Sequence, residues 1–315
     1  MARCVVTGGA GFIGSHIVRR LLADGHEACV VDDLSTGHRE NLAEVADSIE
    51  LLDGSVCDRA LLLRAMEGAQ WVFHQAALAS VQRSVDDPVA SNRINVEGTL
   101  QVLAAARSCG VRRVVFASSS SVYGDAPALP KREDMTPAPK SPYAITKLAG
   151  EHYCAVYHEL FGLETVSLRY FNVFGPHQDP RSQYAAVIPL FISTLMAGRG
   201  PTVFGDGEQS RDFTYVENVA EANIRAAQAP GAPGGVFNVG CGTRYSLNDL
   251  LAMLGRILGL RVRPVYADPR PGDVRDSLAD ISRARQVLGF EPIIGFEEGL
   301  RRTVEWYKAR AEASR

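Results

Sequence analysis

Short runs of consecutive apolar residues alternate, up to about residue 172, with segments in which apolar residues recur at helical spacing. Unbroken apolar runs are typical of parallel strands that are buried on both faces of a sheet. The helical segments between the runs include 12–24, one that begins near Asp58, and a long one over 91–109. Repeated strand–helix–strand units predict an α/β fold with a doubly wound parallel sheet and right-handed crossovers. The runs place its first six strands at 3–7, 28–32, 49–53, 71–74, 113–118 and 164–170.

The pattern changes after residue 172. Residues 173–213 are rich in glycine, proline and polar residues, and they contain one expected helix at 188–197. The earlier pattern then returns with a helix at 216–227 and a strand at 236–239. A last amphipathic helix is expected at 296–311, with Leu300, Val304 and Tyr307 on its apolar face.

These changes predict two domains, which a length of 315 residues allows. We expect residues 1–172, with returning segments at about 214–243, to form a doubly wound domain of the Rossmann type. Residues 173–213 and 244–315 are expected to form a smaller, mixed α/β domain.

Composition and charge exclude several classes of protein. Hydrophobic residues make up 46% of the chain and charged residues 22%, an ordinary globular balance. The net charge of −3 gives no basic excess, so we expect no nucleic-acid partner. No apolar run approaches the roughly 18 residues of a membrane span. The chain begins with strand-like sequence that leaves no room for a signal peptide, which predicts a cytoplasmic protein.

The cysteines and histidines do not suggest a metal site. The six cysteines form no Cys-x-x-Cys pair, and the seven histidines are scattered. We therefore expect free thiols, several of them buried, and no bound metal.

A glycine-rich segment lies between the first expected strand and the first helix. Residues 7–14 read Thr-Gly-Gly-Ala-Gly-Phe-Ile-Gly, in which Gly8, Gly11 and Gly14 are spaced as in dinucleotide-binding turns. Such glycines allow a tight turn, close approach of a diphosphate, and close packing of helix on strand. Asp32 ends the second strand, 21 residues after Gly11, where a carboxylate can accept both ribose hydroxyls and would repel a 2′-phosphate. The segment predicts NAD binding in preference to NADP.

A tyrosine and a lysine share one face of the helix that follows the fifth strand. Ser141 and Pro142 are suited to the start of this helix, which places Tyr143 and Lys147 four residues apart. An ammonium near a phenol favours the phenolate, so we expect Lys147 to lower the pKa of Tyr143 and make it a base near neutral pH. The fifth strand ends in a serine run at 118–121, from which a hydroxyl could bond the substrate oxygen that Tyr143 deprotonates.

At this point the chain resembles the extended short-chain dehydrogenases/reductases, and among them the UDP-hexose 4-epimerases. The resemblance covers nearly the whole chain and includes the two motifs above. Further matching segments are Val-Asp-Asp-Leu at 31–34, His-Gln-Ala-Ala at 74–77, Asn-Val-Glu-Gly-Thr at 95–99, Ser-Ser-Val-Tyr-Gly at 120–124, Arg-Tyr-Phe-Asn-Val-Phe-Gly-Pro at 169–176, Arg-Asp-Phe at 211–213 and Arg-Pro-Gly-Asp at 270–273.

The resemblance implies roles for individual residues. Catalysis would fall to Ser119, Tyr143 and Lys147. NAD would be held by Gly8, Gly11, Phe12, Ile13, Gly14, Asp32, Asp33, Ser55, Val56, Gln75, Ala76, Ala77, Asn95, Tyr143, Lys147 and Tyr170. The UDP-sugar would be held by Ser119, Ser120, Ser121, Asn172, Val187, Val203, Phe204, Arg211, Arg270, Asp273 and Ser277. Family members often carry an aspartate that meets adenine where this chain has Ser55.

The reaction implied by the resemblance is 4-epimerisation of a UDP-hexose, UDP-glucose or UDP-galactose, with the N-acetylated sugars as further candidates. Tyr143 would remove the proton of the 4-hydroxyl while C4 gives a hydride to NAD, and the 4-keto intermediate would turn before the hydride returns to its other face. By the resemblance, related 4,6-dehydratases carry Thr-Asp-Glu where this chain has Ser119-Ser120-Ser121. Elimination of water would therefore lack its acid and base here. A nucleotide-sugar decarboxylase or dehydratase, or a non-catalytic NAD-binding sensor, remains an alternative.

Two further expectations come from the resemblance. Ser277 aligns with a position beside the C2 substituent of the sugar, where members restricted to non-acetylated sugars carry tyrosine. The helix at 91–109, with Leu100, Leu103 and Ala104, and the helix that runs from Tyr143 to Leu160, with Tyr153, Val156 and Tyr157, would pair across a twofold axis in a homodimer.

Overall fold

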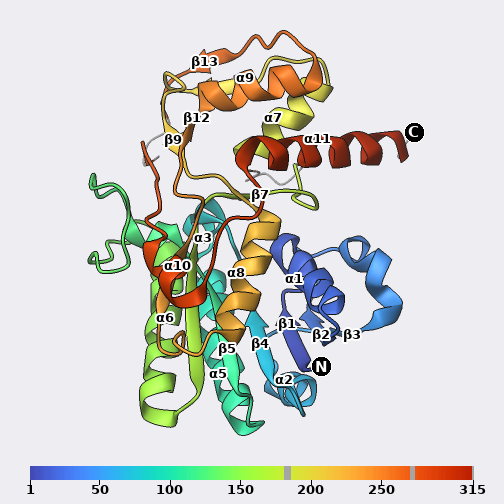
Figure 1. Ribbon diagram of the computed structural model, residues 1–315, viewed down its shortest axis with the longest axis vertical. Coiled ribbons are helices and arrows are strands. Elements are labelled where there is room, and N and C mark those ends of the chain that lie inside the picture. Colours follow the sequence, from blue (N-terminus) through green and yellow to red (C-terminus); the bar gives the residue numbers. More distant parts are fainter. Residues whose placement is uncertain (181–185, 270–273, 314–315) are drawn as a thin grey trace.

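A seven-stranded parallel sheet forms the centre of the molecule (Figure 1). The computed structural model describes residues 1–180, 186–269 and 274–313. The strands are ordered β11-β6-β5-β4-β1-β2-β3, so the order reverses between β1 and β4. This is the doubly wound arrangement predicted from the sequence, and it confirms the fold class. The strands are β1 (Arg3–Thr7), β2 (Glu27–Asp32), β3 (Ile49–Asp53), β4 (Trp71–His74), β5 (Arg113–Ser119), β6 (Glu164–Tyr170) and β11 (Val236–Val239).

Successive residues of each strand supply the two faces of the sheet. In β1, Val6 belongs to the cluster that packs against α1 (Phe12–Ala23) and α8 (Val216–Gln228). Val5 belongs to the cluster on the other face, beneath α2 (Arg59–Met66), α5 (Gly98–Ser108) and α6 (Pro142–Phe161). Both faces are covered, which explains why the strands read as unbroken apolar runs.

The helix expected at 91–109 begins earlier and is not a single α-helix. It consists of α4 (Pro88–Asn92), a π-helical turn, η2 (Arg93–Glu97), and α5. Asp87 caps the start by accepting a hydrogen bond from the amide of Ala90 at 2.9 Å, and Pro88 takes the first helical position. The π-turn places Asn95 beneath the loop that follows β4.

A third apolar cluster lies beyond the carboxyl ends of the strands. Its helices are α7 (Val187–Met196), α9 (Leu247–Leu258) and α11 (Phe296–Ala313), which Figure 1 shows above the sheet. Short strands accompany them: β7 (Val173–Phe174), β8 (Thr202–Phe204), β9 (Ser210–Arg211), β10 (Thr214–Tyr215), β12 (Tyr245–Ser246) and β13 (Val265–Ala267). The remaining elements are η1 (Arg39–Ser48), α3 (Val81–Asp86), η3 (Ser120–Tyr123) and α10 (Ser282–Leu288). Among the described residues, no helix is both long and apolar enough to cross a membrane.

Candidate active site

The glycine-rich turn between β1 and α1 leaves no room for side chains. Gly8 has a positive φ of 69°, and a Cβ atom there would lie 2.6 Å from the amide nitrogen of Ala76. A Cβ on Gly14 would collide with the carbonyl group of Gly8. Helix α1 starts directly after Gly11 without a side-chain cap, so its first amides are directed at the turn. This is an anion-binding cradle of the kind that accepts a dinucleotide diphosphate.

Asp32 stands at the carboxyl end of β2, beside this cradle. Its two carboxylate oxygens accept hydrogen bonds from the amides of Ala10 and Leu34, each at 2.9 Å. Burial raises the pKa of Asp32, although these amides lower it in part. The remaining lone pairs of the carboxylate suit the hydroxyls of an adenosine ribose.

One cleft of about 580 Å³ joins the glycine turn to Tyr143. Its wall contains most of the residues expected to hold the cofactor: Gly8, Gly11, Phe12, Ile13, Gly14, Asp32, Asp33, Val56, Gln75, Ala76, Ala77, Tyr143, Lys147 and Tyr170. Two expected residues are not part of this wall. The Ser55 hydroxyl accepts a hydrogen bond from the amide of Cys57, and Asn95 is buried behind the wall, where it bonds both backbone groups of Leu78.

Helix α6 brings Tyr143, Lys147 and β5 together. Ser141 caps the helix through a hydrogen bond from the amide of Ala144, so Tyr143 lies in its first turn. The Lys147 ammonium lies 5.8 Å from the centre of the Tyr143 ring and donates to the carbonyl of Ala117 at 2.7 Å. Ser119, at the end of β5, lies near the Tyr143 phenol and lowers its pKa. A phenol, a hydroxyl and an ammonium therefore meet at the carboxyl edge of the sheet.

The expectation that Lys147 lowers the pKa of Tyr143 is wrong for the protein chain by itself. Burial of the phenol raises the pKa of Tyr143 to about 12, and the nearby Ser119 side chain reverses only part of this shift. Burial also lowers the pKa of Lys147 to about 8, because the ammonium loses its hydration. Desolvation is the largest influence on the pKa of both groups.

A buried ion pair joins helix α6 to the neighbouring strand β6. Glu151, two turns after Tyr143 on α6, accepts two hydrogen bonds from the guanidinium of Arg169 on β6, at 2.7 and 2.9 Å. Glu151 also accepts a hydrogen bond from the hydroxyl of Ser118 on β5. The motif analysis missed this network, because only the folded sheet brings its members together.

A second pocket, of about 270 Å³, lies between α7 and the short strands that follow it. Four residues expected to hold UDP belong to its wall, namely Asn172, Val187, Phe204 and Arg211. Val203 also belongs to this expected group, but it is fully buried in the third apolar cluster. Apolar walls with one guanidinium suit a nucleoside with a phosphate group.

Comparison with known proteins assigns the chain to a family. The model of the NAD dependent epimerase/dehydratase family matches residues 4–240. A UDP-glucose 4-epimerase of Mycolicibacterium smegmatis is 44% identical over 98% of this chain and 100% of its own length. The chain belongs to the NAD dependent epimerase/dehydratase family. It is an enzyme of the UDP-glucose 4-epimerase type, as the sequence predicted.

Solved structures agree with this assignment. A UDP-N-acetylglucosamine 4-epimerase from Methanobrevibacter ruminantium, in complex with UDP-N-acetylmuramic acid, is 43% identical and superposes with a TM-score of 0.94 over 98% of this chain and 99% of its own. A UDP-glucose 4-epimerase from Thermus thermophilus in complex with NAD is 40% identical, with a TM-score of 0.88 over 97% and 99% of the two chains. Less similar relatives include a dTDP-glucose 4,6-dehydratase of Streptomyces niveus, 35% identical over 97% of this chain and 93% of its own length.

NAD is the cofactor of this family, and the cleft of the epimerase fits it. The glycine turn that a Cβ would block and the carboxylate of Asp32 suit the diphosphate and the adenosine ribose. Lys147 and Tyr143 lie at the other end of the same cleft.

Several expected substrate residues remain to be placed. Ser121 donates its amide to the Ser119 hydroxyl at 3.1 Å, and Ser120 begins the 3-10 turn η3. The amide of Ser277 donates to the carbonyl of Ser210 at 3.0 Å, one residue from Arg211. Arg270 and Asp273 lie outside the described residues.

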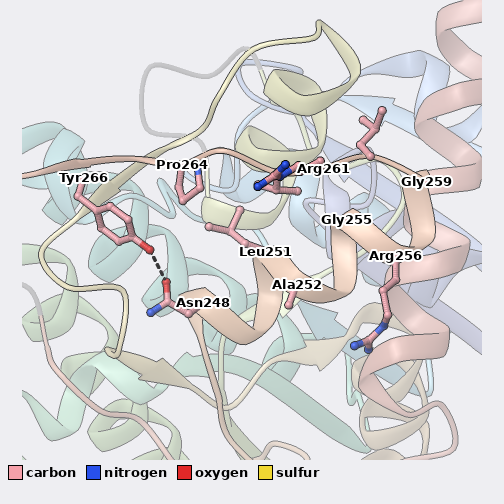
Figure 2. A pocket seen from close by; sticks show the side chains of 11 residues that line it. Asn248, Leu251, Ala252, Gly255, Arg256, Gly259, Arg261, Pro264 and Tyr266 are labelled. Atoms are coloured by element: carbon pink, nitrogen blue, oxygen red, sulfur yellow. Dashed lines mark hydrogen bonds between the residues drawn. The ribbon is translucent and has the colours of Figure 1, made fainter.

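Another groove, of about 650 Å³, lies away from these residues on the outer side of α9 (Figure 2). Its wall combines apolar residues of α9 with the segment 259–266, and Tyr266 donates a hydrogen bond to Asn248 at 3.0 Å. None of the residues predicted to bind cofactor or substrate lines it. In the described part of the chain, no group of three or more histidine, cysteine or acidic residues is placed to hold a metal ion.

Proposed function

We propose that this enzyme interconverts UDP-glucose and UDP-galactose by epimerisation at C4, and that it also accepts their N-acetylated counterparts. The observation that carries the proposal is Tyr143, which lines one cleft together with Lys147 and the glycine turn and has Ser119 as a neighbour. With NAD to accept and return the hydride of C4, one acid–base group at the 4-hydroxyl suffices for epimerisation. The identity of the sugar rests on the relatives, whose names include both UDP-glucose and UDP-N-acetylglucosamine 4-epimerases.

The residues of this chain would hold and move the proton of the 4-hydroxyl. Tyr143 accepts it, Ser119 donates a hydrogen bond to the same oxygen, and Lys147, bound to the carbonyl of Ala117, lies beside the phenol. NAD, when bound, would supply the reversible oxidation at C4 and a cationic ring whose charge favours the phenolate. Tyr143 returns the proton after the substrate has presented its other face.

We assign the UDP moiety to the pocket at Asn172, Phe204 and Arg211, with Arg211 directed to the diphosphate. The segments 173–213 and 244–315 would then form the substrate domain, and residues 1–172 with 214–243 the NAD domain. We place the reaction in the cytoplasm, which the six free cysteines support.

The alternative is a 4,6-dehydratase or a decarboxylase acting on a nucleotide sugar, since relatives at lower identity carry those names. Ser120 and Ser121 occupy the positions where elimination needs an acid and a base, so the site favours epimerisation.

The test is incubation of the purified protein with UDP-glucose, UDP-galactose, UDP-glucuronate and the two N-acetylated sugars, without added NAD. We expect the 4-epimer of each hexose as product, with no net NADH. Loss of water or carbon dioxide as the main reaction would overturn the proposal in favour of the alternative.

A further inference from the structure

The cofactor cleft contains a cationic side chain that the mechanism does not use. Among the described residues of its wall, only Arg83 and Lys147 carry positive charge. Lys147 is bound to the carbonyl of Ala117 beside Tyr143. The guanidinium of Arg83 forms no hydrogen bond or ion pair with any described residue, although it is partly buried. Partial burial of an unpaired guanidinium costs free energy, and its five N–H donors lack acceptors until a ligand binds.

The backbone around Arg83 is held by hydrogen bonds at the start of α3 and to helix α6. The Ser80 hydroxyl accepts a hydrogen bond from the amide of Arg83 at 3.2 Å, at the start of α3. The next residue, Ser84, is buried, and its hydroxyl accepts from the amide of Tyr143 at 3.0 Å. Arg83 is therefore held one residue from a direct contact with the catalytic helix.

The segment that leads to Arg83 starts in direct contact with the glycine turn. The amide of Gln75 donates to the carbonyl of Thr7 at 3.0 Å, and Ala76 is the residue that a Cβ on Gly8 would strike. Residues 75–80 line the cleft from the turn to the start of α3.

The glycine turn itself lacks a counter-charge. Residues 7–14 contain no basic side chain, so only backbone amides would face the two negative charges of a dinucleotide diphosphate. A planar guanidinium binds phosphate oxygens in pairs and is well suited to complete such a site.

We propose that Arg83 binds the diphosphate of the dinucleotide and supplies the charge that the glycine turn lacks. The inference rests on NAD as the cofactor and does not depend on which sugar the enzyme accepts. The signal in the sequence is a basic residue nine positions after the carboxyl end of a central strand, beyond the His-Gln-Ala-Ala segment.

The experiment measures ligand binding to the full chain after bound nucleotide has been removed. NADH, ADP-ribose and AMP are titrated into the wild type, Arg83→Gln and Arg83→Lys. Arg93→Gln is the matched control, because Arg93 is exposed and lies outside the cleft wall. Thermal unfolding of each variant checks that the fold is retained.

We expect Arg83→Gln to weaken the binding of NADH and of ADP-ribose by about 10- to 100-fold, since both ligands carry the diphosphate. Arg83→Lys should retain part of that affinity, while AMP binding and the Arg93→Gln control should change less than about twofold. Unchanged affinity for NADH and ADP-ribose, or an equal loss for AMP, would overturn the assignment.

A carboxylate on the sugar offers the same chemistry as a phosphate, and a second arm separates them. Arg83→Gln could instead lower kcat/KM for UDP-glucuronate but not for UDP-glucose, and leave NADH binding unchanged. That result would show that the guanidinium binds the carboxylate of the sugar and would overturn the assignment to the diphosphate. A wild type that binds NADH through Arg83 but epimerises no sugar would refute the proposed function and leave this inference standing.

Discussion

The surroundings of Tyr143 act on its pKa in opposite directions. Burial holds its pKa at about 12 in the protein chain, while Ser119 favours the ionised form. A tyrosine of this kind stays neutral at pH 7 until further positive charge enters the cleft. The site is therefore suited to remove a proton only when the cationic cofactor is in place.

The first prediction concerns the phenol. Tyr143→Phe removes one hydroxyl from the cleft and leaves α6 intact, because the capping bond of Ser141 involves the amide of Ala144. We expect epimerisation of UDP-galactose to fall by about 10²- to 10⁴-fold with little change in the melting temperature. A coupled assay for UDP-glucose measures this, and activity within about tenfold of the wild type would contradict the role of general base.

The second prediction concerns the size of the sugar. Ser277 is held beside Ser210, next to Arg211 of the nucleotide pocket. If its small side chain leaves space for an N-acetyl group, Ser277→Tyr should clash with that group and lower kcat/KM for the N-acetylated sugars by about tenfold or more. UDP-glucose and UDP-galactose should be affected much less.

Ser277→Ala serves as the control and should turn over both classes of substrate. Equal loss of both classes in Ser277→Tyr, or a wild type inert toward every N-acetylated sugar, would show that Ser277 does not control access.

At the level of elements, the sequence predicted the sheet better than the connections. Strands β1, β3, β4, β6 and β11 have the predicted bounds, because a strand buried on both faces leaves an unbroken apolar run. Helix α6 could be placed from Ser141 and Pro142 at its start. The same reasoning placed Gly8, Asp32 and Tyr143 around one cleft, because the carboxyl ends of parallel strands share an edge.

The elements that were missed lack such local signals. Helix α9 has a capping box formed by Ser246 and Asp249, which could have been found. The π-turn η2 depends on tertiary contacts, since Asn95 bonds Leu78 and Thr146 from distant segments. The network of Ser118, Glu151 and Arg169, and the raised pKa of Tyr143, also depend on burial that a single sequence does not display.

The third prediction is a homodimer formed by α6 and the helical run from α4 to α5. Exposed apolar side chains lie along both, including Val89, Val156 and Leu160, which is 67% exposed. Leu103, one of the residues expected at this interface, is instead buried beneath its own sheet, so the partner would meet Val89 and its neighbours.

We expect a dimer by sedimentation at micromolar concentration, and dissociation to monomers in the double variant Val89→Asp/Leu160→Asp, because each charge would be buried unpaired. Ile293→Asp is the control, since Ile293 is also exposed but lies far along the chain, before α11. A wild-type monomer under these conditions would defeat the proposal.

At the scale of the whole molecule, three histidines join distant segments in their neutral form, His74 fully buried and His16 and His177 partly buried. His16 on α1 contacts the carbonyl of Pro176, and His177 contacts Asn41 while its ring lies 5.1 Å from that of Trp306 on α11. His74 on β4 bridges Thr7 and Thr99 at 2.7 and 2.9 Å. Burial lowers the pKa of His16 and His74 to about 3 and that of His177 to about 4.

The fourth prediction follows from these shifts. Unfolding returns each ring to its ordinary pKa of about 6.5, so the unfolded chain binds more protons below that pH. The stabilisation is complete above about pH 6.5 and is lost as the pH falls toward the folded values, by up to about 1.4 kcal/mol per pH unit for each ring. Asp212 acts in the opposite sense below its pKa of about 6, which burial raises. Its contribution is shared by all variants and cancels when they are compared.

Urea unfolding of the wild type between pH 7.5 and 5 should therefore show a free energy of unfolding that decreases steeply below pH 6.5. His177→Asn should reduce that slope by the contribution of one imidazole, because asparagine does not titrate. Asparagine also tolerates the positive φ of 68° at this position. His152→Gln, at an exposed histidine, should leave the slope unchanged. If His177→Asn and the wild type lose stability in parallel over this range, the neutral state of His177 does not contribute, and the acid sensitivity must come from other groups.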